Sequence, residues 1–286
     1  AVDEFSPLEL SSLNFQSHIE QTAFEKMVEE ARSLIRQGDM FQCVLSQRFS
    51  AEYSGRPLDY YRNLRVTNPS NYLYFYDFGD YQIIGASPES LVSVKQGQVT
   101  TNPIAGTRPR GQDEREDKAL AKELLADEKE VAEHRMLVDL GRNDIGKIAQ
   151  NNSVEVTKYM EVEYFRYVMH LTSVVRGQLL PQLTAMDALK STLPAGTVSG
   201  APKIRAMKRI YELEQEKRGV YAGAIGYLSA TGDMDFAIAI RTMILKNQTA
   251  YVQAGAGIVY DSIAQNEYQE TINKAKSMTR IGELRP

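Results

Sequence analysis

Short strand-like runs that follow one another across tight turns constrain the fold of this chain most. Residues 72–78, 81–87 and 90–101 read as consecutive strands joined by tight turns at Gly79-Asp80 and Gln96-Gly97. Strands connected by turns this short pair antiparallel, because a parallel pair needs a long crossover. We therefore expect antiparallel sheet in the first third of the chain.

Groups of helices separate such runs of strands along the rest of the chain, a pattern that favours an α+β fold. We expect a lead-in segment over 1–18 and, over 19–286, one domain of stacked sheets flanked by helices. The expected helices cover 24–35, two segments of 112–148 that meet near Asp127, and 184–191, 203–217 and 264–281. The further expected strands cover 41–49, 153–163, 167–176, 221–230, 234–246 and 249–259.

Composition narrows the kind of protein. The 286 residues are 43% hydrophobic and carry a formal net charge of -4, so no basic surface indicates a nucleic-acid or membrane partner. No apolar run approaches eighteen residues, and the first residues lack a signal-peptide pattern, so a cytoplasmic protein is expected. Cys43 is the single cysteine and is expected to be a small buried side chain.

Two pairs of glutamates, each three residues apart, fall on segments that are expected to be helical. One pair is Glu130 and Glu133, and the other is Glu267 and Glu270. A three-residue step places both carboxylates of a pair on one helix face. Four carboxylates that meet need a cation or a shared proton, and oxygen ligands favour Mg²⁺. Either pair alone is also typical of a solvated helix face, with Glu270 pairing Lys274.

Three glycine-bearing turns are candidates for anion binding, because their backbone N–H groups can point at a ligand. They are PIAGTRPRG (103–111), PAGTVSGAPK (194–203) and QAGAGIVY (253–260). None has the glycine spacing of a dinucleotide or phosphate-loop fingerprint. In the second, Ser199 is expected to cap a helix that has Pro202 in its first turn.

Arg241 and His170 interrupt apolar runs, and a second histidine, His134, lies beside Glu133. Arg241, in AIAIRTM, needs a protein or substrate anion if it is buried. His170, in YVMHLTSVV, is by itself more typical of a core residue than of a catalyst, and His134 is equally compatible with a structural role. Taken together, the residues indicate a small, doubly anionic substrate held by arginine and glycine N–H groups, with Mg²⁺ on glutamates.

Eight segments together resemble the chorismate-utilising enzyme family and are most similar to the large subunit, component I, of anthranilate synthase. The resemblance implies an α+β fold, a four-layer α/β/β/α sandwich, for the chorismate-binding catalytic domain over 19–286. It also implies a magnesium-dependent lyase of tryptophan biosynthesis that converts chorismate and ammonia to anthranilate and pyruvate. The segments, in the family's order over residues 38–276, are GDMFQCVLSQRF, ASPESLV, PIAGTRPRG, EHRMLVDLGRNDIGKI, YVMHLTSVVRG, LPAGTVSGAPKIRAM, AGAIGYLSATGDMDFAIAIRTM and QAGAGIVYDSIAQNEYQET.

The resemblance also implies site residues. Glu133 and Glu270 match direct Mg²⁺ ligands, with Glu130 and Glu267 beside them or acting through water, and the ring carboxylate of chorismate would sit on the metal. The implied catalytic residues are Glu89, which helps the C4 hydroxyl leave, His170, near the lyase step, and Glu267. The implied substrate-binding residues are Gln42, Gly106, Thr107, Thr197, Tyr221, Arg241, Gly255, Ala256, Gly257 and Lys274, of which Tyr221, Arg241 and the glycine N–H groups would hold the enolpyruvyl carboxylate.

Two positions bear on which nucleophile is used. Gln42 stands where, by resemblance, water-using members carry a lysine as general base, and free ammonia needs no such base. Ala105 stands where many aminodeoxychorismate synthases carry a lysine that attacks the ring. Cys43 lacks the glycine-flanked turn of a glutamine-hydrolysing nucleophile, so ammonia is expected from a separate glutamine amidotransferase subunit.

Other functions remain open from the sequence. One is the sister reaction of aminodeoxychorismate synthase component I, and another is an isochorismate or salicylate synthase that uses water. A third, of a different class, is a non-catalytic regulatory or binding domain that retains the fold. The product formed from chorismate separates all of them.

Overall fold

The computed structural model describes residues 13–165, 168–214 and 216–279. Most of the expected lead-in over 1–18 lies outside these residues, and its described end forms a two-residue strand, β1 (Gln16–Ser17). The described residues form helices and two antiparallel sheets, which confirms the predicted α+β class. No helix among them is long and apolar enough to cross a membrane.

The described chain divides into two compact units, and each carries its own sheet. The chain leaves the first unit after Glu89 and returns to it twice, so each unit is built from segments far apart in the sequence. The first unit contains the described residues up to Glu89, residues 197–223, and the described residues from Ile238 onward; the second contains the described residues of 90–196 and residues 224–237.

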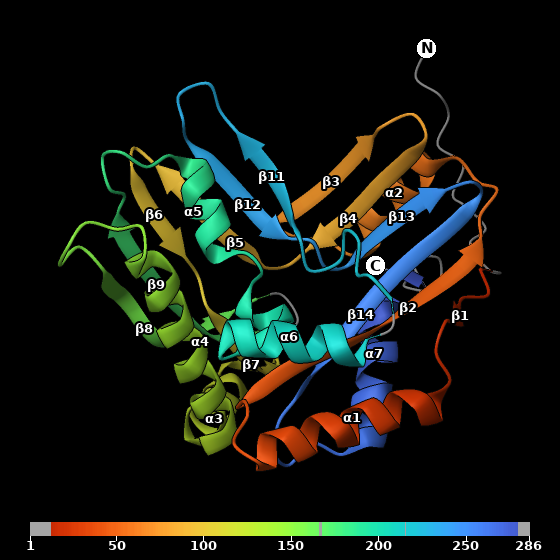
Figure 1. Ribbon diagram of the computed structural model, residues 1–286, viewed down its shortest axis with the longest axis horizontal. Coiled ribbons are helices and arrows are strands. Elements are labelled where there is room, and N and C mark those ends of the chain that lie inside the picture. Colours follow the sequence, from red (N-terminus) through yellow and green to blue (C-terminus); the bar gives the residue numbers. More distant parts are fainter. Residues whose placement is uncertain (1–12, 166–167, 215, 280–286) are drawn as a thin grey trace. The chain divides into compact units, whose positions relative to one another are not determined.

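The sheet of the first unit is seven-stranded, in the order β1-β2-β14-β13-β4-β3, with β10 paired to β2 (Figure 1). Its centre is the long antiparallel pair of β2 and β14, whose register runs from Glu52 opposite Thr249 to Cys43 opposite Ile258. Besides β1, the strands of this sheet are β2 (Gln42–Glu52), β3 (Tyr72–Asp77), β4 (Tyr81–Ser87), β10 (Gly200–Ala201), β13 (Thr242–Lys246) and β14 (Thr249–Ile258).

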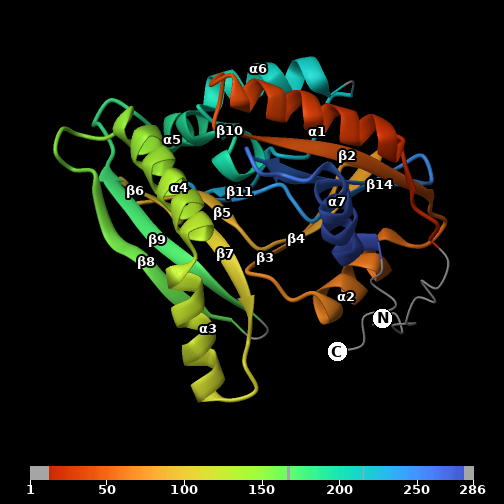
Figure 2. The same ribbon diagram turned by 90° about the horizontal axis from the view of Figure 1, so that it is seen from below.

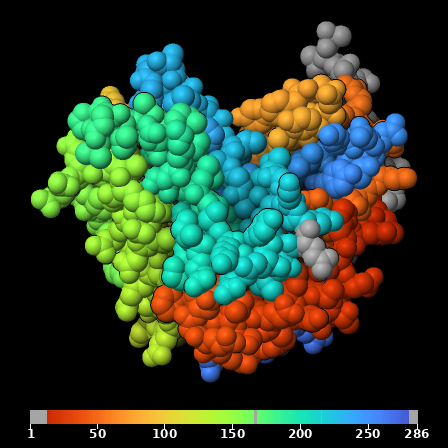
Figure 3. Space-filling model, viewed as in Figure 1, coloured from red at the N-terminus to blue at the C-terminus, as the bar shows by residue number. Residues whose placement is uncertain are grey.

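Alternation along β14 decides which face of this sheet is covered by helices. Ala254, Ala256 and Ile258 are buried in apolar clusters with the helices, whereas Gly255 and Gly257 point to the other face. In Figure 3, α6 (cyan) lies on the surface beside α1 (red). The helices of this unit are α1 (Gln21–Arg36), α2 (Pro57–Thr67), α6 (Lys203–Leu213) and α7 (Ala264–Thr279).

The sheet of the second unit is also seven-stranded, in the order β11-β12-β5-β6-β9-β7, with β8 paired to β9. Figure 2 shows α4 running along one face of the β7 and β9 part of this sheet. Its strands are β5 (Ser90–Lys95), β6 (Gln98–Thr101), β7 (Ile104–Pro109), β8 (Glu155–Tyr164), β9 (Val168–Gln178), β11 (Ala224–Leu228) and β12 (Met234–Ile238), and its helices are α3 (Glu114–Ala126), α4 (Glu128–Gly146) and α5 (Ala185–Thr192).

The predicted junction of two helices near Asp127 is confirmed. Asp127 ends α3 and caps α4, and its carboxylate accepts hydrogen bonds from the backbone N–H groups of Lys129 and Glu130. A side-chain acceptor at this position satisfies donors that the first turn of a helix leaves open. The cap therefore fixes where α4 begins, and with it the position of the Glu130–Glu133 pair.

Three expectations for the local structure are wrong. The strand expected over 234–246 is two strands, β12 and β13, which belong to different sheets, because the chain bends at Arg241 with a φ of 50°. The turn expected over 103–111 is mostly the strand β7, with a bulge at Gly106. The N-cap of α6 is Pro202 and not Ser199, because residues 200–201 pair with β2 as β10.

Candidate active site

Glu89 follows β4 in the first unit and is held by one side chain from a distant segment. The hydroxyl of Thr197 donates a hydrogen bond of 2.9 Å to Oε1 of Glu89. Burial raises the pKa of Glu89 to about 7, although the Thr197 hydrogen bond and the charges of Lys274 and Arg241 act to lower it. The carboxyl can therefore carry a proton near neutral pH, as a general acid requires.

Arg241 sits in the bend between β12 and β13, not within a strand as expected. Its Nη1 donates to Oγ of Ser277 at 3.0 Å, and burial lowers the pKa of its guanidinium. The structure gives Arg241 no salt bridge to any of the described carboxylates. A half-buried guanidinium without a salt bridge to the described carboxylates is suited to bind an anionic ligand.

Lys274 on α7 connects the glutamates of that helix to β14. Its Nζ lies 2.6 Å from Oε1 of Glu270 and donates to the carbonyl oxygen of Gly255 at 3.0 Å. The predicted i,i+4 pair of Glu270 and Lys274 is thus present. Glu267 lies one turn earlier on α7, so both predicted carboxylates of this pair share a helix face with the lysine.

The two glycines of β14 leave room for neighbouring side chains. A Cβ atom at Gly255 would lie 2.5 Å from the hydroxyl oxygen of Tyr221, and one at Gly257 would lie 2.8 Å from Nε2 of Gln42. Gln42 is buried, and its Oε1 has no hydrogen-bond partner among the described residues. Between them, Ala256 is fully buried on the helix-covered face, so only its backbone can serve a ligand. The predicted substrate residues Gln42 and Tyr221 therefore meet the glycine pair.

Tyr221 is held by a buried ion pair that the sequence analysis did not single out. The guanidinium carbon of Arg218 lies 5.4 Å from the ring centroid of Tyr221, and Nη2 of Arg218 lies 2.7 Å from Oε1 of Glu214. Burial raises the pKa of Tyr221 to about 12, so its hydroxyl stays a neutral donor. The i,i+4 spacing of Glu214 and Arg218 was the available signal, but the same spacing is common on exposed helices.

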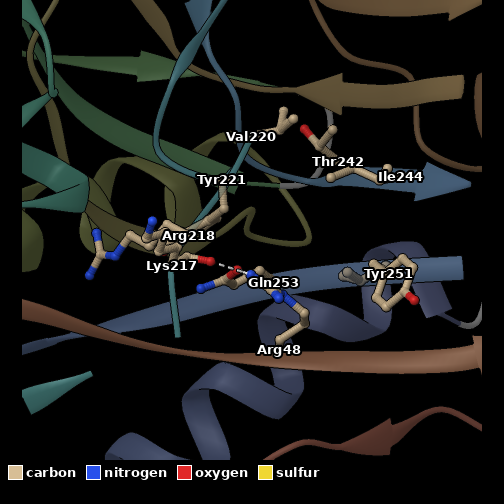
Figure 4. Close-up of a pocket in the computed structure, with 11 residues that line it drawn as sticks. Arg48, Lys217, Arg218, Val220, Tyr221, Thr242, Ile244, Tyr251 and Gln253 are labelled. Atoms are coloured by element: carbon tan, nitrogen blue, oxygen red, sulfur yellow. Dashed lines mark hydrogen bonds between the residues drawn. The ribbon is translucent and has the colours of Figure 1, made fainter. Parts of the chain in front are cut away.

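A cavity of about 300 Å³ lies in the first unit beside this pair (Figure 4). Tyr221 and Arg218 line it together with Thr242 and Ile244 of β13 and Gln253 of β14. Arg48 reaches it from β2 and donates to the carbonyl oxygen of Lys217. The cavity therefore lies between the Tyr221 segment and residues of β2, β13 and β14.

The second unit gathers the other predicted residues around β7 and β9. Nδ1 of His170 lies 3.0 Å from Oγ1 of Thr107 and 3.0 Å from the carbonyl oxygen of Gly106. The His170 ring packs against Phe165, with centroids 5.4 Å apart. A Cβ atom at Gly106, where φ is 67°, would lie 3.3 Å from Oε2 of Glu130. The structure therefore brings Gly106, Thr107, Glu130 and His170 together within one unit.

His134 and Cys43 have structural surroundings. His134 is fully buried, its Nε2 lies 2.6 Å from Oγ of Ser173, and burial lowers its pKa. Cys43 is buried and free, and burial raises the pKa of its thiol to about 12. The prediction of a small buried side chain at Cys43 is confirmed.

The two predicted metal-binding pairs lie on different units, Glu267 and Glu270 on α7 and Glu130 and Glu133 on α4. Their carboxylates are the hard oxygen ligands that suit Mg²⁺, and a pair of them leaves positions for water and substrate oxygens. Among the residues that the structure describes, no group of three or more His, Cys, Asp or Glu side chains is arranged to hold a metal. The carboxylates therefore have the donor chemistry that a magnesium ion prefers. The site formed by all four of them stays a prediction.

An arginine without a carboxylate partner and an acid that holds its proton near neutral pH suit an enzyme that acts on a small anion. A family model described as chorismate binding enzyme matches residues 4–280. The chain belongs to this chorismate-binding enzyme family, and its mixed helix and sheet architecture is the one that the family shares.

Curated relatives and solved structures agree with this membership. The chain is 62% identical over 275 residues to anthranilate synthase component 1 of Lactococcus lactis. The aligned residues make up 96% of this chain and 60% of the relative. The crystal structure of anthranilate synthase component I from Streptococcus pneumoniae TIGR4 matches with a TM-score of 0.91 and 81% identity, over 98% of this chain and 62% of that one. The menaquinone-specific isochorismate synthase MenF of Escherichia coli matches with a TM-score of 0.87 and 25% identity, over 98% of this chain and 65% of that one. The chain therefore spans about 60% of the length of its anthranilate synthase relatives.

Proposed function

We propose that this chain is the catalytic part of an anthranilate synthase component I, a lyase that converts chorismate and ammonia to anthranilate and pyruvate in tryptophan biosynthesis. The observation that carries the proposal is the 62% and 81% identity to proteins of that name over nearly the whole chain, against 25% to an isochorismate synthase. By resemblance, Gln42 and Ala105 stand at the positions whose side-chain chemistry separates the reactions of the family, and both suit ammonia that adds directly to the ring.

The acid and the anion-binding groups of the first unit support the first step. Glu89 would donate a proton to the departing C4 hydroxyl, since burial keeps its pKa near 7. The enolpyruvyl carboxylate would be bound by Arg241, by the Tyr221 hydroxyl and by the N–H groups around Gly255. Arg241 is available for this role because it forms no salt bridge with the described carboxylates. Thr197 would keep Glu89 oriented through its hydrogen bond.

Magnesium would be held by Glu133 and Glu270, with Glu130 and Glu267 beside them or acting through water. When bound, such an ion polarises the carboxylate that it coordinates and serves as a template for it. Lys274, whose Nζ lies 2.6 Å from Oε1 of Glu270, would orient the Glu270 carboxylate and balance its charge. The ring carboxylate of chorismate would be the substrate group at this metal.

The side chain at position 42 supports ammonia as the nucleophile. Gln42 is neutral and buried, with an acceptor oxygen that has no partner among the described residues, and such an oxygen can accept a hydrogen bond from ammonia. Ala105 in β7 has no amine with which to attack the ring, so no covalent intermediate is expected. Ammonia would come from a glutamine amidotransferase, anthranilate synthase component II, as a separate subunit.

The remaining step, elimination of pyruvate, needs a ring proton to be removed. His170 in the second unit is the candidate base, and its Nδ1 contacts to Thr107 and Gly106 leave Nε2 for the substrate. The proposal is tested by incubating the chain with chorismate, Mg²⁺ and an ammonium salt and identifying the product. Anthranilate is the expected product, 4-amino-4-deoxychorismate would favour the sister reaction, and folded but inactive protein would favour a non-catalytic domain.

A further inference from the structure

The buried guanidinium of Arg218 makes four hydrogen bonds to three separate segments of the first unit. Its Nε donates to Oε2 of Glu214 at 2.8 Å and its Nη2 donates to Oε1 of Glu214 at 2.7 Å. Nη1 donates to the carbonyl oxygen of Val198 and Nη2 also donates to that of Val44, both at 2.6 Å. One side chain therefore joins the end of α6, the segment that follows Gly196, and β2.

The Glu214 carboxylate accepts further hydrogen bonds besides those from Arg218. Its side chain is 7% exposed, and its Oε1 also accepts hydrogen bonds from the backbone N–H of Ser46 at 2.8 Å and from the Ser46 hydroxyl at 2.9 Å. A buried carboxylate and guanidinium are stable only when their remaining donors and acceptors are satisfied. Lysine, with a single ammonium, cannot reproduce a fork that faces a carboxylate and two carbonyl groups at once.

The segments that Arg218 joins carry residues of the proposed active site. Val198 directly follows Thr197, whose hydroxyl holds Glu89, and the next residue, Ser199, accepts a hydrogen bond from the N–H of Val44 at 2.8 Å. The guanidinium carbon of Arg218 lies over the ring of Tyr221, at a distance typical of a cation–π contact. The Tyr221 hydroxyl in turn lies against Gly255.

We propose that Arg218 and Glu214 form a positioning pair, which holds the Thr197 segment and the ring of Tyr221 in register so that the proton-donating acid and the carboxylate-binding hydroxyl act on one substrate. This inference rests on the proposed function for its substrate, but the positioning pair itself is present in the protein without substrate. Neither side chain is among the groups proposed to bind or protonate the substrate. Arg218 acts through the Val198 carbonyl and the Tyr221 ring, and Glu214 acts through Arg218.

The kinetic test compares Arg218→Lys with Arg209→Lys. Arg209 lies on α6 and forms ion pairs with Asp39 and Glu212, but it contacts neither Tyr221 nor the Thr197 segment. Because small displacements of catalytic groups are costly, Arg218→Lys should lower kcat/KM for chorismate by about 10- to 100-fold, with a raised KM and a lowered kcat. Arg209→Lys should change both constants by less than about twofold.

Glu214→Gln, which keeps the shape of the carboxylate, guards against a variant that simply fails to fold. It should reproduce the pattern of Arg218→Lys, and the double variant should lose little more than either single one, because the two residues act as a unit. Backbone hydrogen exchange supplies a readout without substrate. The Val44 amide, which donates to Ser199, should exchange faster in Arg218→Lys than in the wild type and at the wild-type rate in Arg209→Lys.

The outcomes separate this inference from the proposed function. If wild-type protein forms no anthranilate, the proposed function fails, while hydrogen exchange of the Val44 amide still tests whether the positioning pair holds the Thr197 segment. Wild-type kinetic constants in folded Arg218→Lys and Glu214→Gln would overturn the inference. So would a loss of activity that follows only the fraction of folded protein, with unchanged KM and kcat in what remains folded.

Discussion

The hydroxyl of Thr197 donates to Oε1 of Glu89 at 2.9 Å, which joins two segments 108 residues apart in the sequence. The hydrogen bond favours the carboxylate form and so acts against the burial that raises the pKa of Glu89. The balance places that pKa at about 7, so a substantial fraction of the acid carries its proton at neutral pH and can donate it. The Thr197 contact thus orients the proposed proton donor and offsets part of the effect of burial on its acidity.

Glu89→Gln should block departure of the C4 hydroxyl, because an amide is not a general acid at neutral pH. In the wild type, kcat should fall as the pH rises through about 7, when Glu89 loses its proton. Stability follows the same group: its folded-state pKa is raised above the usual 4.5, so its contribution is present below pH 4.5 and is lost as the pH rises to about 7. Urea unfolding at pH 5 and pH 8 should therefore show a smaller drop in stability for Glu89→Gln than for the wild type, and equal drops would contradict the burial of an ionisable group there.

Glu270→Gln should abolish anthranilate formation while leaving the fold intact, because it removes a proposed Mg²⁺ ligand from an exposed face of α7. Thermal melting should change little, since the Glu270–Lys274 pair is exposed and such pairs contribute about 0–1 kcal/mol. Glu25→Gln, on the exposed face of α1, is the matched control and should keep wild-type activity. Undiminished wild-type turnover in excess chelator would contradict the requirement for magnesium.

His170→Met should let the aminated intermediate accumulate, because the proposed base for removal of the ring proton is lost while the earlier steps keep their residues. Methionine is flexible and uncharged, so it replaces the ring that contacts Phe165 and Thr107 without adding a charge. Chromatography of quenched reactions should show aminodeoxyisochorismate in place of anthranilate. Normal anthranilate formation by this variant would remove His170 from the mechanism.

Gln42→Lys should direct part of the flux toward isochorismate, because a lysine amine can activate water where the amide cannot. Gln42 is buried beside Gly257, so desolvation would lower the pKa of the new amine and supply a fraction of it as free base. Gln42→Met, similar in size and unable to act as a base, is the control and should form no isochorismate. The same absence in Gln42→Lys would show that this position does not select the nucleophile.

Much of the fold follows from local patterns in the sequence. Apolar residues at helical spacing predict α1, and Gly38 just past its end, with a φ of 78°, explains why it stops. Asp127 was identifiable as a junction because a short acidic side chain both ends one helix and caps the next. The helix α2 was missed, although Pro57 stands at its first turn, where proline is favoured.

Pairings between distant segments were beyond local patterns. The run 234–246 looks continuous in sequence, yet it contributes one strand to each sheet because Arg241 adopts a positive φ. The contact of His170 with Thr107 depends on the pairing of β9 with β7, which no periodicity reveals. The buried Glu214–Arg218 pair looks like an ordinary exposed i,i+4 pair until the burial of both side chains is known.

The single most direct test supplies the chain with chorismate, Mg²⁺ and ¹⁵N-ammonium and follows both the small-molecule products and the mass of the protein. We expect ¹⁵N-anthranilate and an equal amount of pyruvate, with the protein mass unchanged throughout, because the Ala105 side chain cannot bond to the ring. 4-Amino-4-deoxychorismate as the main product, or a protein mass increased by a substrate-derived adduct, would contradict it.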